Sequence, residues 1–260
     1  MILHYSISQV APYINWIYFF HAWGSSQMAQ PDRRQLQAEA EERLCRYADR
    51  YQTHALLLLA DARSEGDDLM LGDVRLPLLR QQQADSDFLC LADFVSPVAD
   101  RVGVFATTVS PGLETDFDGD PYEKMMMQLL ADRLAEATAE LLHEQVRKHY
   151  WGYAPDEQLT VSQMQREQFQ GIRPAVGYPS LPDTSLNFVI DRLLDLQQIG
   201  IRLTTSGAMK PHASVSGLMM AHPEARYFSV GQIGDDQLAD YARRRGLPVP
   251  LMRKFLGGNL

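Results

Sequence analysis

The sequence predicts an α+β fold: a single domain over residues 1–260, with an antiparallel sheet and flanking helices. Strand-like segments follow one another directly, at 54–63 and 68–72, instead of alternating with helices. The run from Pro121 to Trp151 contains no further proline and no glycine, which indicates one long helix. No linker, repeat or low-complexity tract divides the 260 residues. A chain of that length can bury roughly three quarters of its unfolded surface without disulfides or metals.

The first third of the chain predicts a buried segment and a helix. Residues 10–23 are apolar and aromatic, but the run is too short to span a bilayer, and no lysine or arginine precedes it. We therefore expect it to pack on the body of the domain. Pro31 opens a polar stretch to Tyr51 in which apolar residues recur every three or four positions, as in an amphipathic helix.

Four strands are expected next. Residues 54–63 form a buried strand, and residues 64–68 form a turn in which Gly66 can adopt a positive φ. Residues 68–72 complete a hairpin. Residues 87–95 and 101–109 are the two further strands.

The second half begins with the long helix, which Asp120 and Pro121 start. A capping box at Thr160 and Gln163 predicts a short helix, whereas residues 171–183 hold too many prolines and glycines for regular structure. Asp183 caps a helix that ends near Gly200. Residues 213–220 and 226–233 are expected to pair as a second hairpin, and short helices follow at 237–245 and 250–255.

Composition and missing motifs exclude several functions. The chain has 24 basic and 33 acidic side chains, a net charge of −9 that argues against binding nucleic acid. No two of the 17 glycines are spaced two apart, so the GxGxxG loop that binds dinucleotides is absent. The sequence also contains neither the phosphate-binding loop of nucleotide hydrolases nor a GxSxG elbow. His143-Glu144 begins a zincin-like motif, but Arg147 stands where the second histidine is needed. No metal site is therefore expected.

Cysteine usage and the missing targeting signals predict a location. Cys45 and Cys90 make no CxxC motif and no disulfide framework, so we expect a reducing, cytoplasmic setting and no membrane association.

Residues 173–179, RPAVGYP, form the first candidate site. Arg173 can clamp a carboxylate, Tyr178 offers an amphipathic ring, and Gly177 permits a close approach. A rigid loop of this kind suits an amino-acid-like or nucleoside ligand. A proline-rich connection whose arginine merely covers a helix end is an equally good interpretation of these residues.

The second candidate is a row of acids on the long helix. Asp132, Glu136 and Glu140 are spaced four apart and so share one face. Such a row is ordinarily a solvated surface. If that face lines a cleft, the carboxylates could instead meet a cation or take a proton.

Longer motifs carry a resemblance to a known family. They are ADRLAEA (131–137), LHEQVRKHYWGYAPDEQL (142–159), QGIRPAVGYPSLPD (170–183), ASVSG (213–217), HPEARYFSVGQI (222–233) and DYARRRG (240–246). Together they resemble the C-terminal activation domain of cobalamin-dependent methionine synthase, a part of methionine biosynthesis. The resemblance runs from Tyr13 to about Leu256 and is loose over residues 24–86.

The resemblance implies a C-shaped domain with a bent antiparallel sheet that binds S-adenosylmethionine without a dinucleotide-binding motif. In this family the domain supports reductive remethylation: flavodoxin or another reductase donates an electron to cob(II)alamin, and S-adenosylmethionine donates the methyl group. The DxHxxG motif that ligates cobalt is absent here. The cobalamin is therefore expected outside this chain. If Met1 is the native terminus, which the ordinary start MILHYSIS favours, the chain acts in trans on a separate methionine synthase; otherwise it is a fragment of a longer one.

The resemblance also implies the ligand residues, none of them catalytic. Arg173 would pair with the methionyl carboxylate, and Ala175 and its neighbours, Gly177 among them, would meet the adenine end. The further ligand contacts implied are Glu136, Tyr178, Tyr227 and Phe228, while Asp132 and Glu167 would line the cobalamin-facing cleft.

Two positions depart from the family pattern. Asn15 stands where the family has an aspartate facing the ligand's amino group, and Phe228 replaces the second tyrosine of a pair. An amide still accepts a hydrogen bond but gives up the charge, which weakens binding roughly five- to tenfold. Two functions follow: an activation subunit that binds S-adenosylmethionine, or a docking or cap module for a cobalamin protein that has lost this ligand. The RPAVGYP loop and Glu136 favour the first, and Asn15 and Phe228 favour the second.

Overall fold

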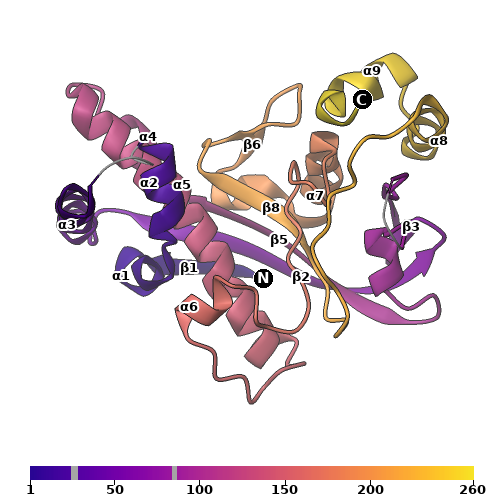
Figure 1. The fold of residues 1–260 in the computed structure, drawn as a ribbon, viewed down its shortest axis with the longest axis horizontal. Coiled ribbons are helices and arrows are strands. Elements are labelled where there is room, and N and C mark those ends of the chain that lie inside the picture. Colours follow the sequence, from indigo (N-terminus) through magenta and orange to yellow (C-terminus); the bar gives the residue numbers. More distant parts are fainter. Residues whose placement is uncertain (25–28, 84–86) are drawn as a thin grey trace.

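Strand β2 (Gln52–Glu65) is a central strand of a curved antiparallel sheet, which crosses the middle of the view in Figure 1. The computed structural model describes residues 1–24, 29–83 and 87–260. Within these residues the main sheet contains β1 (Ile2–Ser6), β2, β3 (Asp68–Leu71), β4 (Val74–Pro77), β5 (Asp100–Val109) and β8 (Ser214–Met219), in the order β4-β3-β2-β5-β8. A two-stranded ribbon of β6 (Arg202–Leu203) and β7 (Met209–Lys210) lies apart from it.

Strand β2 is long enough to pair with two different strands along one of its edges. Its first residues pair with β1, with Tyr5 opposite Thr53, and its last residues pair with β3, with Ala62 opposite Leu71. Its other edge pairs with β5 over ten residue pairs, from Thr53↔Val109 to Ala62↔Asp100. The hairpin of β2 and β3 turns at Gly66, whose φ is 61°. The hairpin predicted from the sequence is therefore confirmed.

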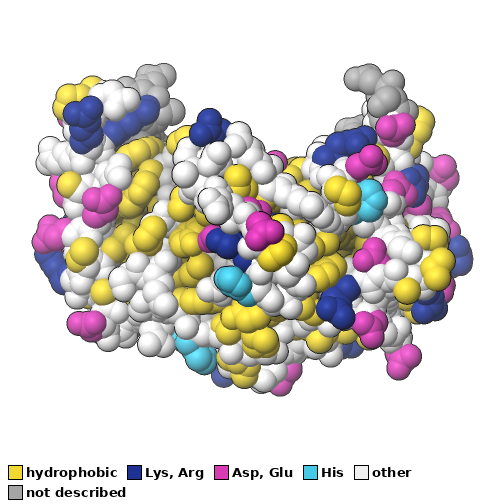
Figure 2. All heavy atoms as spheres, turned by 90° about the horizontal axis from the view of Figure 1, so that it is seen from below, with side chains coloured by type: hydrophobic (Ala, Val, Ile, Leu, Met, Phe, Trp, Pro, Cys, Tyr) yellow, Lys and Arg dark blue, Asp and Glu magenta, His cyan; other side chains and the backbone are white. Residues whose placement is uncertain are grey.

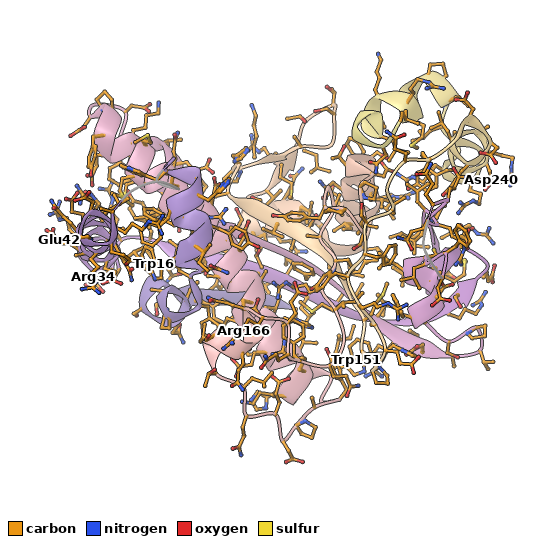
Figure 3. The ribbon with its side chains drawn as sticks, in the orientation of Figure 1. Trp16, Arg34, Glu42, Trp151, Arg166 and Asp240 are labelled. Carbon is orange, nitrogen blue, oxygen red and sulfur yellow. The ribbon has the colours of Figure 1, made fainter. Side chains whose placement is uncertain are left out.

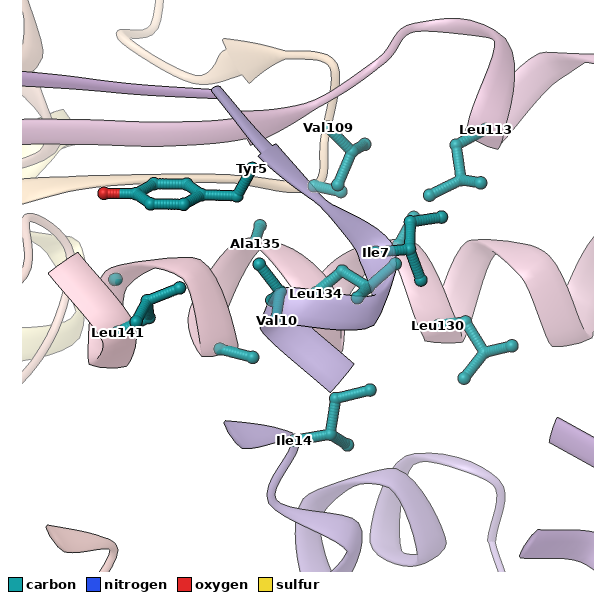
Figure 4. Packing of buried hydrophobic residues seen from close by; sticks show 14 of the residues in the cluster. Tyr5, Ile7, Val10, Ile14, Val109, Leu113, Leu130, Leu134, Ala135 and Leu141 are labelled. Carbon is teal, nitrogen blue, oxygen red and sulfur yellow. The ribbon is translucent and has the colours of Figure 1, made fainter. Parts of the chain in front are cut away.

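Residues of β5 alternate between two apolar cores, one on each face of the sheet. Phe105 and Val109 belong to the core that the long helix covers, and Val104 and Ala106 belong to the core on the opposite face. Figure 4 shows the first core, to which Val109 of β5 and Leu134 and Ala135 of the helix all belong. Both faces of β5 are thus buried, which explains the nearly continuous apolar run in its sequence.

Helices surround this sheet. They are α1 (Ile7–Val10), α2 (Trp16–Ala22), α3 (Gln30–Arg46), α4 (Gly112–Thr115), α5 (Pro121–Gln145), α6 (Val161–Met164), α7 (Asn187–Leu194), α8 (Asp235–Arg245) and α9 (Val249–Phe255). Helices α1, α2, α3 and α5 cover one face, and α7 covers the other (Figure 1). Helices α8 and α9 hold a small third core near the C-terminus.

Helix α5 begins where the sequence indicates. The Asp120 carboxylate accepts the backbone N–H groups of Tyr122 and Glu123, and Pro121 occupies the first turn. The helix then widens into a π-helical turn from Val146 to Tyr150. Residues 187–199 are less regular than predicted, because Asp195 adopts a positive φ of 51° and separates α7 from a short 3₁₀ turn.

The prediction for residues 10–23 is confirmed only in part. Val10, Ile14 and Phe19 are buried in the core against α5. Ile17 and Tyr18 on α2 point the other way and are 75% and 58% exposed. The segment is therefore amphipathic, with one face on the body of the protein and the other in solvent.

The predicted strand at residues 87–95 is wrong. The structure has an isolated bridge between Arg80 and Cys90, followed by a 3₁₀ turn from Leu91 to Phe94. The Asp93 carboxylate accepts the Cys90 N–H and the Arg80 guanidinium, so side chains satisfy groups that a ladder would otherwise use. Strands β1 and β4, which the sequence analysis did not predict, occupy the sheet positions instead.

The second predicted hairpin is also wrong. Residues 214–219 form β8, but residues 226–233, all described, form no strand. The Val230 N–H donates to the Pro179 carbonyl, and the Phe228 carbonyl accepts the Ser180 hydroxyl. This segment therefore lies against the proline-rich loop and not against β8.

On the face seen in Figure 2, acidic and basic side chains are interspersed among apolar ones. Among the described residues, no helix is long and apolar enough to cross a membrane.

Candidate functional site

A cavity of about 740 Å³ opens beside α5, a size that suits a small organic ligand. Segments far apart in the sequence line it, and Figure 3 marks two of them: Trp16 begins α2, and Arg166 lies between the lining residues Gln165 and Glu167. The lining residues are Tyr13, Asn15, Tyr18, His21, Ala22, Arg133, Glu136, Ala137, Ala139, Glu140, Met164, Gln165, Glu167, Phe169, Arg173, Pro174, Ala175, Tyr178, Pro179, Ser180, Val215, Tyr227 and Phe228.

Helix α5 provides the acidic wall. Glu136 and Glu140 lie one turn apart and both line the cavity. The same helix is held against the sheet from its other side, where the Thr107 hydroxyl of β5 donates to the Ala135 carbonyl at 2.9 Å. Of the two interpretations of the acid row, the cleft is therefore correct for these two glutamates.

The RPAVGYP loop is built on the free edge of β8. Ile172 and Met220 exchange two backbone hydrogen bonds, the Leu218 N–H donates to the Pro174 carbonyl, and the Val176 N–H donates to Ser216. A Cβ at Gly217 would collide with the Pro174 carbonyl oxygen, so only glycine allows this approach. The loop thus covers an edge that would otherwise be unpaired, and its place in the cavity wall is fixed by backbone bonds.

Arg173 is held at both its ends. Its backbone N–H donates to the Tyr227 hydroxyl oxygen at 2.9 Å, and its Nη2 donates to Glu140 Oε2 at 3.1 Å. Burial alone would lower the pKa of Arg173, but Glu140, Tyr227 and Glu136 together outweigh it and raise that pKa, so the guanidinium stays charged. Its Nη1 is buried and has no hydrogen-bond partner in the described structure.

Glu136 sits in a second polar group. Both its oxygens accept from the Arg133 guanidinium, at 2.8 and 3.2 Å, and Oε1 also accepts from the Tyr178 hydroxyl at 3.1 Å. The Tyr178 ring is half exposed at the rim of the cavity. The arginine, the acid and the tyrosine therefore join α5 to the RPAVGYP loop across the cavity wall.

Asn15 lines the cavity, as the sequence analysis expected, and it has a second task. Its Oδ1 accepts the Ile17 N–H at 3.1 Å and so caps α2. An amide has one oxygen, and here that oxygen serves the helix.

Glu167 also lines the cavity, in an unusual backbone conformation. Its φ is 57°, in the left-handed region that residues with side chains seldom adopt. Burial raises the pKa of its carboxyl, an effect that Glu140 strengthens and Arg173 opposes. Non-glycine residues held in this region cluster at binding sites, because the surrounding structure must stabilise them.

Tyr227 and Phe228 differ in what they contribute. The Tyr227 hydroxyl fixes the backbone of Arg173, whereas Phe228 contributes its ring to the lining and its carbonyl to Ser180. The missing second hydroxyl therefore costs the loop no contact that Tyr227 makes.

Two expected residues lie outside the lining of the described cavity. Gly177, with φ of 88°, shapes the turn of the loop, and its N–H donates to Leu181. Asp132 lies one turn before Glu136, and its Oδ1 is 3.3 Å from His212 Nδ1. Ala175 lies in the lining and pairs with Gly217.

Several lining residues were not selected from the sequence. Glu140, by contrast, belongs to the acid row named in the sequence analysis, but that spacing did not indicate its ion pair with Arg173. Tyr13 and Phe169 reach the cavity from segments that only the fold brings to α5. Among the described residues, no group of three or more histidine, cysteine, aspartate or glutamate side chains could hold a metal ion.

A curled antiparallel sheet with a cavity between an acid-bearing helix and an arginine-bearing loop is an arrangement that suits a small organic ligand. A family model described as "Vitamin B12 dependent methionine synthase, activation domain" matches residues 6–246. A crystal structure titled as the MetH reactivation domain bound to AdoHcy is 37% identical, with a TM-score of 0.93, and covers 100% of this chain and 90% of that chain. The chain therefore belongs to the activation-domain family of vitamin B12-dependent methionine synthase. The α+β fold with a bent antiparallel sheet is the fold of this relative.

Proposed function

We propose that this chain binds S-adenosylmethionine in the cavity beside α5. The observation that carries the proposal is that the ion pair between Arg173 and Glu140 leaves polar atoms of both side chains without hydrogen bonds. Each side chain keeps one buried polar atom without a partner in the described chain, and both residues line a cavity large enough for such a ligand. A buried polar group without a hydrogen bond is costly, so a ligand that satisfies both atoms gains affinity. The similar domain whose structure holds AdoHcy supports the same ligand class.

Different residues of the cavity would contact different parts of the proposed ligand. Arg173 is placed to hold the carboxylate in a charge-assisted bond, and the backbone around Ala175 can meet the adenine end. Glu136, Asn15, Tyr178, Tyr227 and Phe228 complete the wall. Gly177 acts through the shape of the loop, and Glu167 contributes an exposed residue to the lining. When bound, S-adenosylmethionine supplies the methyl group.

The wider role we propose is support of reductive remethylation in methionine biosynthesis. The family implies a cobalamin-binding partner region. One electron from flavodoxin or another reductase and one methyl group from S-adenosylmethionine together convert cob(II)alamin to methylcobalamin and leave S-adenosylhomocysteine. This chain would contribute proximity, because a donor held above the corrin reacts in an effectively unimolecular step. The face with Asp132, Glu136 and Glu167 would meet the partner, in the cytoplasm, and residues 1–260 would act as one folded unit.

A ligand-free docking module is the second candidate, and Asn15 favours it. Its oxygen is used by the α2 cap, which weakens the expected contact to the ligand's amino group. The unpartnered atoms of Arg173 and Glu140 favour the first candidate, since a site that had lost its ligand would gain stability by satisfying them.

Calorimetric titration with S-adenosylmethionine and with S-adenosylhomocysteine separates the two candidates. Saturable binding of both supports the binding subunit. Absence of binding at millimolar ligand would leave only the docking module.

The partner role needs a second experiment. A methionine synthase without its own activation domain is trapped as cob(II)alamin and mixed with reductant and methyl-labelled S-adenosylmethionine. Label should reach cobalamin only when this chain is added. Transfer at the same rate without the chain would exclude the activation role.

A further inference from the structure

The ion pair between Arg173 and Glu140 is incomplete on both sides. Nη2 of the arginine donates to Oε2 of the glutamate at 3.1 Å, and the two side chains are 16% and 13% exposed. Arg173 Nη1 and Glu140 Oε1 are both buried with no hydrogen-bond partner in the described structure. Both residues line the cavity. The pair therefore keeps an unused donor and an unused acceptor, on two residues that both line the cavity.

An α-amino acid zwitterion has the complementary pattern. Its carboxylate and its ammonium are attached to the same carbon atom, so they reach two neighbouring partners of opposite charge. A carboxylate takes a guanidinium N–H, and an ammonium donates to a carboxylate oxygen. Arg173 Nη1 and Glu140 Oε1 are such a pair of partners.

The other side chains that could accept an ammonium are less suited. Both oxygens of Glu136 already accept from Arg133, and one of them also accepts from Tyr178. The oxygen of Asn15 caps α2. Glu167 is exposed, and its pKa is raised by burial of part of its carboxyl, so its charge is less firmly held.

We propose that Glu140 is the specificity-determining residue that accepts the α-ammonium of the ligand, while Arg173 holds the carboxylate beside it. The inference rests on the proposed binding of S-adenosylmethionine and adds the residue that selects an amino-acid end. It also explains how the chain operates with Asn15 in place of an aspartate, because the charge opposite the ammonium comes from α5.

The test combines a change in the ligand with a change in the protein. The ligands are S-adenosylhomocysteine and S-(3-carboxypropyl)-5′-thioadenosine, which keeps the carboxylate but lacks the amino group. The protein is titrated unchanged and as Glu140→Gln, whose amide oxygen can still accept from Arg173. Glu144→Gln is the matched control, since Glu144 lies one turn further along α5, outside the described lining of the cavity.

The unchanged protein should bind S-adenosylhomocysteine about ten- to hundredfold more tightly than the deamino ligand, the range of one charge-assisted bond. Glu140→Gln should lose most of that preference and bind the deamino ligand as the unchanged protein does. Glu144→Gln should keep the preference.

Three outcomes overturn the inference. If the unchanged protein binds the two ligands equally, no residue selects the ammonium, and this measurement does not depend on any variant folding. If Glu140→Gln keeps the full preference, another residue accepts the ammonium. If the unchanged protein binds neither ligand, the proposed function itself fails, and the inference fails with it.

Discussion

The Tyr227 hydroxyl oxygen accepts the backbone N–H of Arg173 at 2.9 Å. The two residues are 54 positions apart in the chain, yet this bond fixes the start of the loop that carries the cavity arginine. Burial raises the pKa of Tyr227, so the hydroxyl remains protonated and neutral at physiological pH. A single hydroxyl thus connects the irregular segment 226–233 to the proposed ligand contact.

Replacing Tyr227 with phenylalanine should weaken both stability and binding. The Arg173 N–H would lose its partner, which costs about 1–3 kcal/mol for a buried donor. Urea unfolding and ligand titration of Tyr227→Phe measure the two effects. Phe228→Tyr is the control, since it adds a hydroxyl at the neighbouring position, and it should leave the unfolding free energy nearly unchanged. Equal stability of Tyr227→Phe and the unchanged protein would contradict the role of this bond.

Arg173→Ala should reduce affinity for S-adenosylhomocysteine ten- to hundredfold. The substitution removes a charge-assisted contact of about 1.5–3 kcal/mol and leaves Glu140 as a buried charge without its partner. Calorimetry gives the dissociation constant, and Arg166→Ala, on an exposed neighbouring residue, is the control. An unchanged dissociation constant would remove the RPAVGYP loop from the binding site.

Asn15→Asp should tighten binding of S-adenosylmethionine. A carboxylate has two oxygens, so one can keep the cap on α2 while the other faces the cavity, and aspartate caps helices as well as asparagine does. The added charge should improve affinity roughly five- to tenfold. The comparison is made by titration at one ionic strength. Weaker binding by Asn15→Asp would mean that position 15 does not face the positive end of the ligand.

Gly217→Ala should separate the loop from β8. The new methyl group would collide with the Pro174 carbonyl oxygen and crowd Ala175, both backbone atoms that cannot move alone. Overpacking of this kind typically costs about 1–3 kcal/mol, and here it should also lower ligand affinity. Gly119→Ala is the matched control, because no atom lies near a Cβ at that position. If Gly217→Ala has the same melting temperature and the same ligand affinity as the unchanged protein, the loop tolerates displacement from β8.

Acid should destabilise the protein through His143. This side chain is completely buried, and burial, helped by the charges of Arg173 and Arg147, holds its pKa well below the usual value. Below pH of about 6.5 the unfolded chain binds a proton that the folded chain does not, so the free energy of unfolding falls as the pH falls. The limiting slope for one group is about 1.4 kcal/mol per pH unit.

The variant His143→Gln should flatten this part of the pH profile, measured by urea unfolding between pH 5 and pH 8. His149→Gln, on an exposed residue of the π-helical turn, should keep the slope of the unchanged protein. The same slope in His143→Gln would assign the acid sensitivity to other groups.

Local signals made part of this fold predictable. The start of α5 is set by Asp120 and Pro121, and the hairpin of β2 and β3 by Gly66, all within a few residues of the element. The apolar run of β5 likewise indicates a strand without knowledge of its neighbours. These elements were predicted correctly from the sequence.

Pairing partners were not predictable in the same way. Residues 226–233 carry a strand-like pattern, but the edge of β8 that they would use is taken by Ile172, Pro174 and Val176. Residues 87–95 fail as a strand because Asp93 and Arg80 satisfy the backbone there. Which edge is free depends on contacts between distant segments, which no local pattern contains.

The candidate site was likewise predictable in its local motifs but not in the contacts between distant segments. The motif loop and the acid row pointed to Arg173 and Glu136, and both line the cavity. The partnership of Arg173 with Glu140, and that of Tyr227 with the loop backbone, depend on how α5, β8 and the C-terminal third meet. Spacing along the chain could name the faces but not the contacts across the cavity.

The spread of the cavity lining along the chain has a thermodynamic consequence. Its walls come from residues as distant as Tyr13 and Phe228, so opening any one of several segments would destroy the site. A ligand that binds only the folded protein raises its free energy of unfolding. The increase is about 2.7 kcal/mol when the ligand concentration is a hundred times the dissociation constant. Heat denaturation should then shift upward for the β sheet and for α5 together, as one cooperative transition, and the size of the shift reports affinity without any label.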